Sequence, residues 1–345
     1  MIRQTLEIFD NLISGYLSLK RLSQLPIVDT MLTHHTAQHF PFLNVPDNSA
    51  SRSAFYRSLS ILLFLDKNVE KFDAFIAPFS QNFQILLSQS SVEALKQDQC
   101  RKLFIGLLRD LTGIFSGCQT KAQYEQVWNW IFPKYIEIIA KGAGLLYDCP
   151  AVTSPLLKLG IQMSTNRGGR LDFGCSSANG ILLFREISNI VVEYGSRIAS
   201  VVSPEPSRYS SKLKGVYLTL KMMVQALSGN YVNFAIFELY GDPCLSKALG
   251  TCVELSRDIQ LSDLEAYPKL SEAYFNFLQH LCKHHLKYVL ALEQRSFLQM
   301  IMFIREGLNH QSKFFSWLLE VAHSLFRRIF WAMLRNGRVF GHFLL

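Results

Sequence analysis

Hydrophobic side chains recur along the chain with the spacing of amphipathic α-helices. One stripe comprises Val216, Leu220, Met223 and Leu227. Further stripes of three- and four-residue spacing comprise Leu270, Tyr274, Phe277, Leu278 and Leu281, and then Leu290, Phe297, Ile301 and Ile304. Residues three and four apart share one helix face. Sustained two-residue alternation is hard to find and no strand–glycine turn–helix unit occurs, so the pattern predicts an all-α protein of about a dozen helices.

Proline and capping residues predict where some of these helices begin. Thr153-Ser154-Pro155 predicts a cap and a proline in the first turn of a helix that continues through Leu156. Asp242-Pro243 predicts a helix over 244–255, and Tyr267-Pro268 predicts one over 269–286. Stretches rich in Pro, Gly and polar residues predict loops at 39–53 and 166–180 and a linker at 203–206.

Many amphipathic helices with short connections fit two architectures. One is a globular bundle, and the other is a solenoid of helix pairs, in which a HEAT-type array repeats every ~40–47 residues. The helix-opening phrases at Pro155, Pro243 and Pro268 do not recur at a strict period. The pattern alone therefore leaves both architectures open.

Composition narrows the class of protein. Hydrophobic residues make up 49% of the 345 residues, which suits a large core and excludes disorder of the whole chain. The apolar run near Leu59–Leu65 is interrupted by Ser60 and ends at Asp66, well short of the roughly 18 residues of a membrane span. Glu7 and Asp10 interrupt any signal-peptide core. We therefore expect no membrane insertion.

The seven cysteines are widely spaced and form no C-x-x-C motif, so we expect small buried apolar residues. No P-loop, G-x-S-x-G or H-E-x-x-H motif occurs. We thus predict no catalytic residue, no cofactor-binding residue and no enzyme activity. His280 and His284, like His35 and His39, have the i,i+4 spacing that can hold zinc, but packing or surface histidines explain them equally, and we predict no metal.

Positive charge exceeds negative charge by 8, and about half of the excess lies in residues 305–345. Nucleic-acid binding calls for clustered Lys and Arg with stacking aromatics or a known motif. No such motif occurs, so we predict no nucleic acid as a partner. An acidic protein surface and a plain solvated face remain as the two interpretations of the excess charge.

Several longer strings carry more specific information. Segment 150–195 contains T-x-P-x-L-K-L, N-R-x-x-R-L-x-F and S-S-x-N-G-I-L-L-F-R-E. Other such strings are SRSAFYRSL at 51–59, GLLRDLTGI at 106–114, WNWIFPKY at 128–135, ALSGNYVNFAIFELYGD at 226–242 and SDLEAYPKLSEAYF at 262–275. Together, over residues 1–307, they resemble the exportin-7 type of nuclear transport receptor in the importin-β superfamily. That resemblance implies an α-solenoid of HEAT-like repeats, stacked as antiparallel helix pairs.

The resemblance also implies a function. Such receptors bind protein cargo and Ran-GTP, contact Phe-Gly nucleoporins, and shuttle between nucleus and cytoplasm through the nuclear pore. Their cycle uses GTP hydrolysis by Ran, so the receptor itself needs no catalytic residue or cofactor. The alternative function is a helical-repeat interaction scaffold without a Ran-driven transport cycle.

The resemblance divides the chain in two. Residues 1–307 are expected to be a HEAT-like segment that matches an internal, later part of longer family members. Residues 308–345 form a basic, aromatic tail that departs from the family, as a frameshifted or read-through tail would.

For partner contacts, the candidates are Arg167, Arg170 and Arg185, because guanidinium groups bind carboxylates in bidentate fashion. Salt bridges that brace the loop are the alternative role for these arginines.

Overall fold

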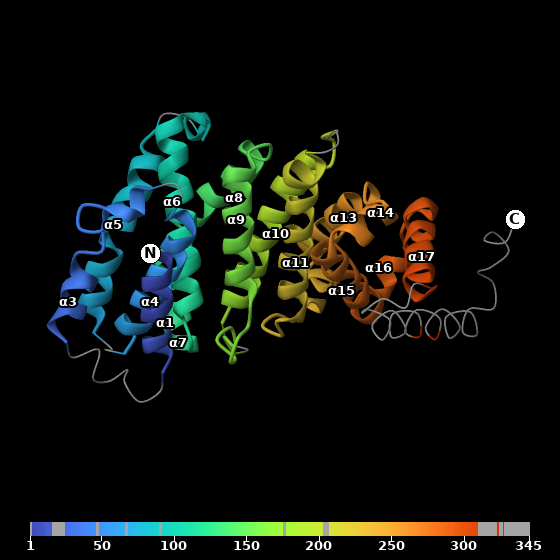
Figure 1. Ribbon diagram of the computed structural model, residues 1–345. Helices are drawn as coiled ribbons and strands as arrows, with labels where there is room; N and C mark the ends of the chain where they lie inside the picture. The colour runs from blue at the N-terminus through green and yellow to red at the C-terminus, as the bar shows by residue number, and fades with distance from the viewer. Residues whose placement is uncertain are drawn as a thin grey trace, which may run out of the picture.

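The computed structural model describes residues 2–15, 25–45, 48–65, 68–89, 92–174, 177–202 and 207–309, together with residues 323 and 327. Within these ranges every regular element is a helix. Figure 1 shows the helices stacked side by side along one direction, with α3 and α5 towards one end and α17 towards the other. The predicted all-α solenoid is therefore confirmed.

The longer helices form two layers. In the first layer each helix packs against the next along the array: α1 (Ile2–Ser14), α4 (Ser49–Leu63), α6 (Asp98–Gly117), α9 (Pro150–Ser164), α11 (Lys214–Ser228) and α15 (Pro268–His284). The second layer contains α8 (Ile136–Leu145), α10 (Asn179–Ile198), α13 (Cys244–Arg257) and α17 (Gln294–Asn309). Because α10 contacts α9 and α11 as well as α8 and α13, the layers are joined into helix pairs.

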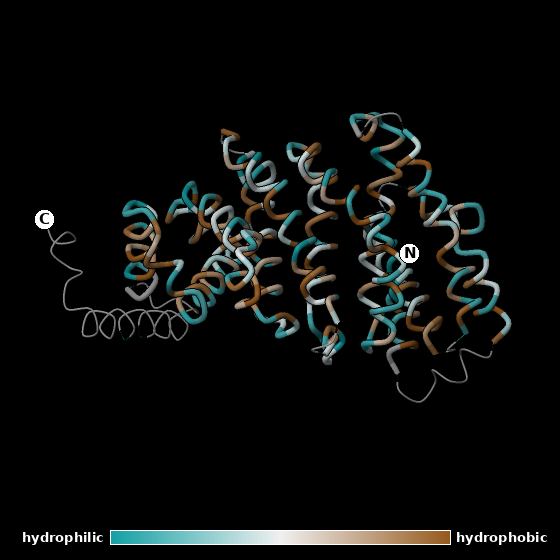
Figure 2. The backbone as a smooth tube through the Cα atoms, turned by 180° about the vertical axis from the view of Figure 1, so that it is seen from behind, coloured by the Kyte–Doolittle hydropathy of each residue, from teal (hydrophilic) through white to brown (hydrophobic). Residues whose placement is uncertain are grey.

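Shorter and flanking helices complete the array. They are α3 (Pro26–Thr33), α5 (Val69–Leu87), α7 (Lys121–Ile131), α12 (Ala235–Leu239), α14 (Leu261–Ala266) and α16 (Leu286–Leu290), with single turns η1 (Pro41–Asn44), η3 (Val92–Lys96) and η4 (Tyr209–Leu213). One continuous apolar core extends from Leu6 in α1 to Ile304 in α17. Figure 2 shows hydrophobic and hydrophilic segments alternating along the helices, as amphipathic helices require.

Helices α4 and α6 pack especially closely because glycines replace side chains at their contact. A Cβ atom on Gly113 would lie 2.4 Å from the carbonyl oxygen of Ser53, and one on Gly117 would lie 2.6 Å from the Cβ of Ser60. Across the same contact, Arg52 Nε donates to Asp110 Oδ1 at 2.7 Å. The contact between these two helices therefore combines close backbone approach with a buried ion pair.

The helix starts predicted from Pro243 and Pro268 are confirmed, since α13 begins at Cys244 and α15 at Pro268. The start predicted from Pro155 is wrong, because α9 begins at Pro150 and contains Pro155 in its interior. The carbonyl of Ala151, which loses its helical partner there, belongs to an exposed residue and water can satisfy it.

The loop predicted at 39–53 is wrong in its second half, because α4 begins at Ser49. Ser53 of this stretch lies at the close contact with α6, where its Oγ donates to the carbonyl of Arg109 at 2.8 Å. The loop at 166–180 is confirmed for its described residues as far as α10, which begins at Asn179. The linker at 203–206 and most of the tail at 308–345 lie outside the described residues.

Candidate protein-interaction surface

Arg170, one of the three candidate arginines, lies inside the protein. Its side chain is fully buried in the loop between α9 and α10. Its guanidinium donates to the carbonyls of Phe115 and Cys118, the latter at 3.1 Å, where α6 ends. It also donates to the carbonyls of Gln162 and Thr165, the latter at 2.9 Å, where α9 ends. Arg170 therefore closes the C-terminal ends of two neighbouring first-layer helices.

Helix ends explain this arrangement. The last four carbonyls of an α-helix have no partner within the helix, and the C-terminal end carries partial negative charge. A guanidinium has five N–H donors and satisfies several such carbonyls at once. Arg170 also lies over the ring of Tyr124, with its central carbon 5.5 Å from the ring centroid. The structure thus gives Arg170 the loop-bracing role and leaves its guanidinium out of reach of a partner.

Arg167 and Arg185 are accessible. Arg167 is exposed on the same loop, and within the described ranges its side chain has no ion pair. Arg185 lies in α10 and donates to Asp242 Oδ2 from Nε at 3.0 Å and from Nη2 at 2.6 Å. This pairing lowers the pKa of Asp242, to which a backbone hydrogen bond from Cys244 also contributes. Arg185 thus links α10 to the start of α13 while 49% of its side chain stays exposed.

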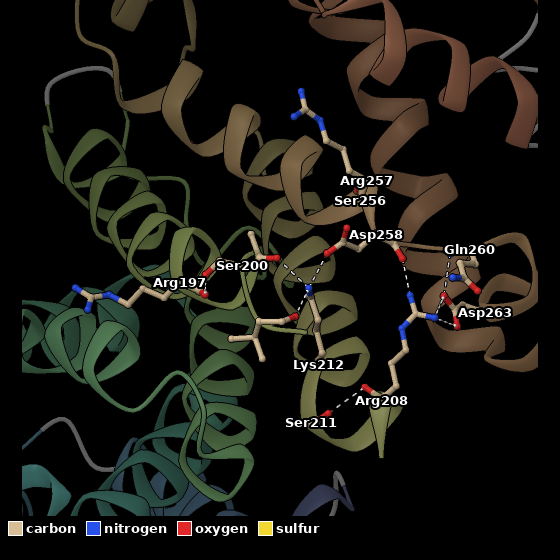
Figure 3. A network of polar contacts seen from close by, with 12 residues as sticks. Arg197, Ser200, Arg208, Ser211, Lys212, Ser256, Arg257, Asp258, Gln260 and Asp263 are labelled. Atoms are coloured by element: carbon tan, nitrogen blue, oxygen red, sulfur yellow. Dashed lines mark hydrogen bonds and ion pairs between the residues drawn. The ribbon is translucent and has the colours of Figure 1, made fainter. Parts of the chain in front are cut away.

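A second buried cation closes helix ends further along the array. Figure 3 shows Lys212 between the end of α10 and the end of α13. Lys212 Nζ donates to the carbonyls of Ala199 at 3.0 Å and Val201 at 2.7 Å, and to Asp258 Oδ2 at 2.6 Å. The ammonium is buried, whereas the Asp258 side chain is 54% exposed. No local sequence signal marks Lys212 for this role, because two of its three acceptors precede it by more than ten positions and the third follows it by 46.

Arg208 extends the same network to α14 (Figure 3). Its Nη1 donates to Asp263 Oδ1 at 3.1 Å and its Nη2 donates to the carbonyl of Asp258 at 2.5 Å. Asp263 in turn accepts from the backbone N–H of Gln260 at 2.8 Å, which caps α14. These contacts fix successive helix pairs against one another, so the outer faces of the array keep a defined spacing.

Two grooves open on the surface of the described part. The first, of about 810 Å³, lies between α8 and α10, and its charged lining is mainly acidic: Glu93, Glu137, Lys141, Glu186, Glu193 and Arg197. Burial raises the pKa of Glu186. The second, of about 880 Å³, lies at α5 and α6, and its charged lining is mainly basic: Arg52, Lys102, Arg109 and Asp110. Sequence reasoning missed both, because each draws residues from helices far apart in the chain.

The paired histidines form no evident metal site. Rings of His280 and His284 stack with centroids 5.9 Å apart. His35 is buried against Phe75 and Phe79. In the part of the chain that the structure describes, no three His, Cys, Asp or Glu residues are grouped so as to hold a metal ion.

Within the described ranges no helix has both the length and the apolar character needed to cross a bilayer.

Sequence comparisons identify relatives along almost the whole chain. Residues 1–51 match the family model described as the exportin-7-like TPR domain. Exportin-7-B of Xenopus laevis is 37% identical over 314 residues, which cover 89% of this chain and 29% of that protein. Ran-binding protein 17 of Homo sapiens is 36% identical over 317 residues, which cover 90% of this chain and 29% of that protein. Exportin-7 of Dictyostelium discoideum is 34% identical over 311 residues, which cover 90% and 31%.

These findings confirm the resemblance to exportin-7-type proteins over about nine-tenths of the chain. The chain spans about three-tenths of the length of the curated relatives it matches. The TPR description of residues 1–51 agrees with the fold, since TPR and HEAT repeats are both arrays of helix pairs.

Proposed function

We propose that this chain is a segment of a nuclear export receptor. The observation that carries the proposal is continuous similarity over more than 300 residues to proteins named exportin-7 and Ran-binding protein 17. The fold supports the same function, because stacked helix pairs provide extended surfaces that suit large protein partners. The names of the relatives, exportin and Ran-binding protein, refer to export and binding, so the proposed function is binding rather than catalysis.

We propose further that the receptor binds protein cargo and Ran-GTP and contacts Phe-Gly nucleoporins, and so shuttles between nucleus and cytoplasm. Cooperation between cargo and Ran-GTP then follows from linkage. If both ligands favour the same curvature of the solenoid, each raises the affinity for the other by the same factor, typically through 1–3 kcal/mol of coupling free energy. Residues 1–307 are proposed to be the repeat segment, and the boundary at 307 falls within α17.

Arg167 and Arg185 remain the proposed contacts for carboxylates of a protein partner. Arg167 is exposed and Arg185 keeps about half of its side chain accessible. Arg170 is no longer a candidate, because its guanidinium is buried among carbonyls. Arg167→Glu is expected to weaken partner binding, whereas Arg295→Glu, the same charge change on exposed α17, is expected to leave it unchanged. Equal losses in the two variants would assign the effect to net charge.

A binding assay with Ran tests the proposed function directly. The purified chain is immobilised and exposed to Ran loaded either with a non-hydrolysable GTP analogue or with GDP. We expect a preference of at least about tenfold for the GTP form, which corresponds to ~1.4 kcal/mol. Equal retention of the two forms, or none of either, would contradict Ran-dependent transport by this segment. Partners captured without regard to Ran would then favour the scaffold function.

A further inference from the structure

Four cations form a row across successive helices of the first layer. They are Arg109 in α6, Lys158 in α9, Lys214 in α11 and Lys269 in α15. These helices pack in that order, each against the next. Lys158 and Lys269 are exposed, and Arg109 and Lys214 are partly buried. We call these four residues the cation row.

Lys158 is close enough to the other three members of the row to be repelled by each of them. Partial burial lowers the pKa of Lys158, and repulsion from Lys214, Arg109 and Lys269 lowers it further. The pKa of Arg109 is likewise lowered, by burial first and then by the charge of Arg52, while the nearby carboxylate of Asp110 offsets part of this. Lys158 therefore lies in a zone of positive potential to which the other three cations contribute.

In the described part of the chain, no carboxylate forms an ion pair with a member of the cation row. None of its four members forms an ion pair within the described ranges, whereas other cations do, among them Lys141 with Glu137 and Arg197 with Glu193. Asp110, beside Arg109, is already paired with Arg52. Glu272 lies one turn beyond Lys269 but forms no ion pair in the described part. An anion supplied from outside would relieve a repulsion around Lys158 that no ion pair of the described part cancels.

A groove lies beside one end of the cation row, and a helix N-terminus lies at the other end. Arg109 also lines the groove of about 880 Å³ at α5 and α6, where Lys102, Gln99 and Asn82 add further donors. At the other end, Lys269 occupies the first turn of the 17-residue helix α15, where the helix dipole disfavours a cation and favours an anion. A bound carboxylate there would be attracted both by the ammonium and by the helix end.

We propose that the cation row and the adjoining groove bind an extended acidic segment of a protein partner. Packed helices lie about 8–10 Å apart, and an extended chain advances about 3.3–3.6 Å per residue. An acidic residue at every third position would therefore meet one cation on each helix. This inference rests on the proposed function, because it names the chemistry of a protein that the receptor segment would bind.

A protein fits the row better than a nucleic acid does. Binding of single-stranded nucleic acid relies on aromatic side chains that stack on bases. Among the large apolar side chains that are strongly exposed in the described part, the one aromatic is Tyr240, after α12. Three of the four cations are lysines, which offer flexible point charges for separate carboxylates. The row therefore supplies charge without the stacking platform.

The proposal is tested with a fluorescein-labelled 12-residue peptide that carries Glu at every third position among Gly and Ser. Binding to the purified chain is measured by fluorescence anisotropy at several salt concentrations. We expect saturable binding that weakens with salt and a loss of about tenfold or more for Lys158→Glu. The matched control is Lys247→Glu, the same charge change at an exposed lysine of α13 in the other layer.

Three outcomes would overturn the proposal. They are no peptide binding by the natural chain, equal losses in Lys158→Glu and Lys247→Glu, or tighter binding of a thymidine oligonucleotide of equal charge with the same dependence on Lys158. Circular dichroism and the neutral variant Lys158→Gln, which keeps the long side chain, separate a charge effect from misfolding. The Ran assay tests the transport function separately. If the peptide binds but Ran shows no preference for GTP over GDP, only the transport function is contradicted.

Discussion

Buried and exposed cations of this protein have opposite relations to the fold. Arg170 and Lys212 are enclosed, and nearly all their donors meet carbonyl oxygens at the C-terminal ends of neighbouring helices. Arg109 and Lys158 lie in the middle of α6 and α9, where the helix already uses its own carbonyls. The first pair satisfies groups that the helices leave unpaired, whereas the second pair forms no ion pair in the described part, and Lys158 is repelled by neighbouring cations.

This difference shows that the role of a basic residue in a solenoid depends on its position along the helix. Every helix pair in the array ends in carbonyls that must find donors, and a cation beside two such ends can serve both repeats. A cation in mid-helix on the layer surface has no such task and remains available to a partner. Removal of an enclosed cation should therefore cost stability, and removal of a row cation should cost binding.

The largest effect is expected for Arg170→Met, which keeps bulk but removes every donor. The carbonyls of Phe115, Cys118 and Gln162 would be left buried without their partner. We expect a loss of about 3–5 kcal/mol in the free energy of unfolding, measured by urea denaturation. Arg167→Met, three residues earlier on the exposed part of the same loop, should change it by less than about 0.5 kcal/mol. Comparable losses in both variants would contradict the bracing role.

Lys212→Met should have the next largest effect. Two carbonyls, of Ala199 and Val201, would lose their donor, but Asp258 is half exposed and can be hydrated instead. We expect a loss of about 2–3 kcal/mol in urea denaturation. Asp258→Asn removes the charge partner while the ammonium keeps both carbonyls, so it should cost less than the lysine variant. The reverse order would show that the ion pair, rather than the carbonyls, stabilises this helix junction.

The sequence predicted the fold far better than it predicted the roles of these side chains. Helical periodicity alone indicated the all-α class, and Pro243 and Pro268 marked helix starts, because a proline signal acts within one turn. The helix start predicted from Pro155 was wrong, since α9 had already begun at Pro150 and could accommodate a second proline. The burial of Arg170 was not predictable, because the carbonyls it meets belong to residues about 50 positions earlier as well as to its neighbours.

A basic group whose burial outweighs its hydrogen bonds is instead kept neutral, and His35 is the example. Its ring is buried against Phe75, its Nε2 has no hydrogen-bond partner in the described part, and burial lowers its pKa from 6.5 to about 4. Between these values the unfolded chain binds a proton that the folded chain does not. The contribution of His35 to the free energy of unfolding should therefore fall as pH drops from about 6.5 to 4, by about 2 kcal/mol between pH 7 and pH 5.

The control for His35 is the variant His35→Phe, which keeps an aromatic ring between Phe75 and Phe79. Urea denaturation at pH 7 and pH 5 gives the loss for each protein. The natural chain should lose about 2 kcal/mol more than the variant, because the remaining histidines are common to both. Equal losses would show that His35 does not govern the acid sensitivity.

The smallest effect on stability is expected in the cation row, and it completes the contrast. Lys158→Gln removes one member of a group of like charges while the side chain keeps a long polar stem on the exposed face of α9. The free energy of unfolding should change by no more than about 0.5 kcal/mol, and its sign should be stabilising at low salt, because repulsion from Lys214 and Arg109 is relieved. The gain should vanish as salt is raised, since screening already weakens the same repulsion in the natural chain. A destabilisation of the size expected for Lys212→Met would mean that Lys158 braces the fold, and the division between enclosed and partner-binding cations would fail.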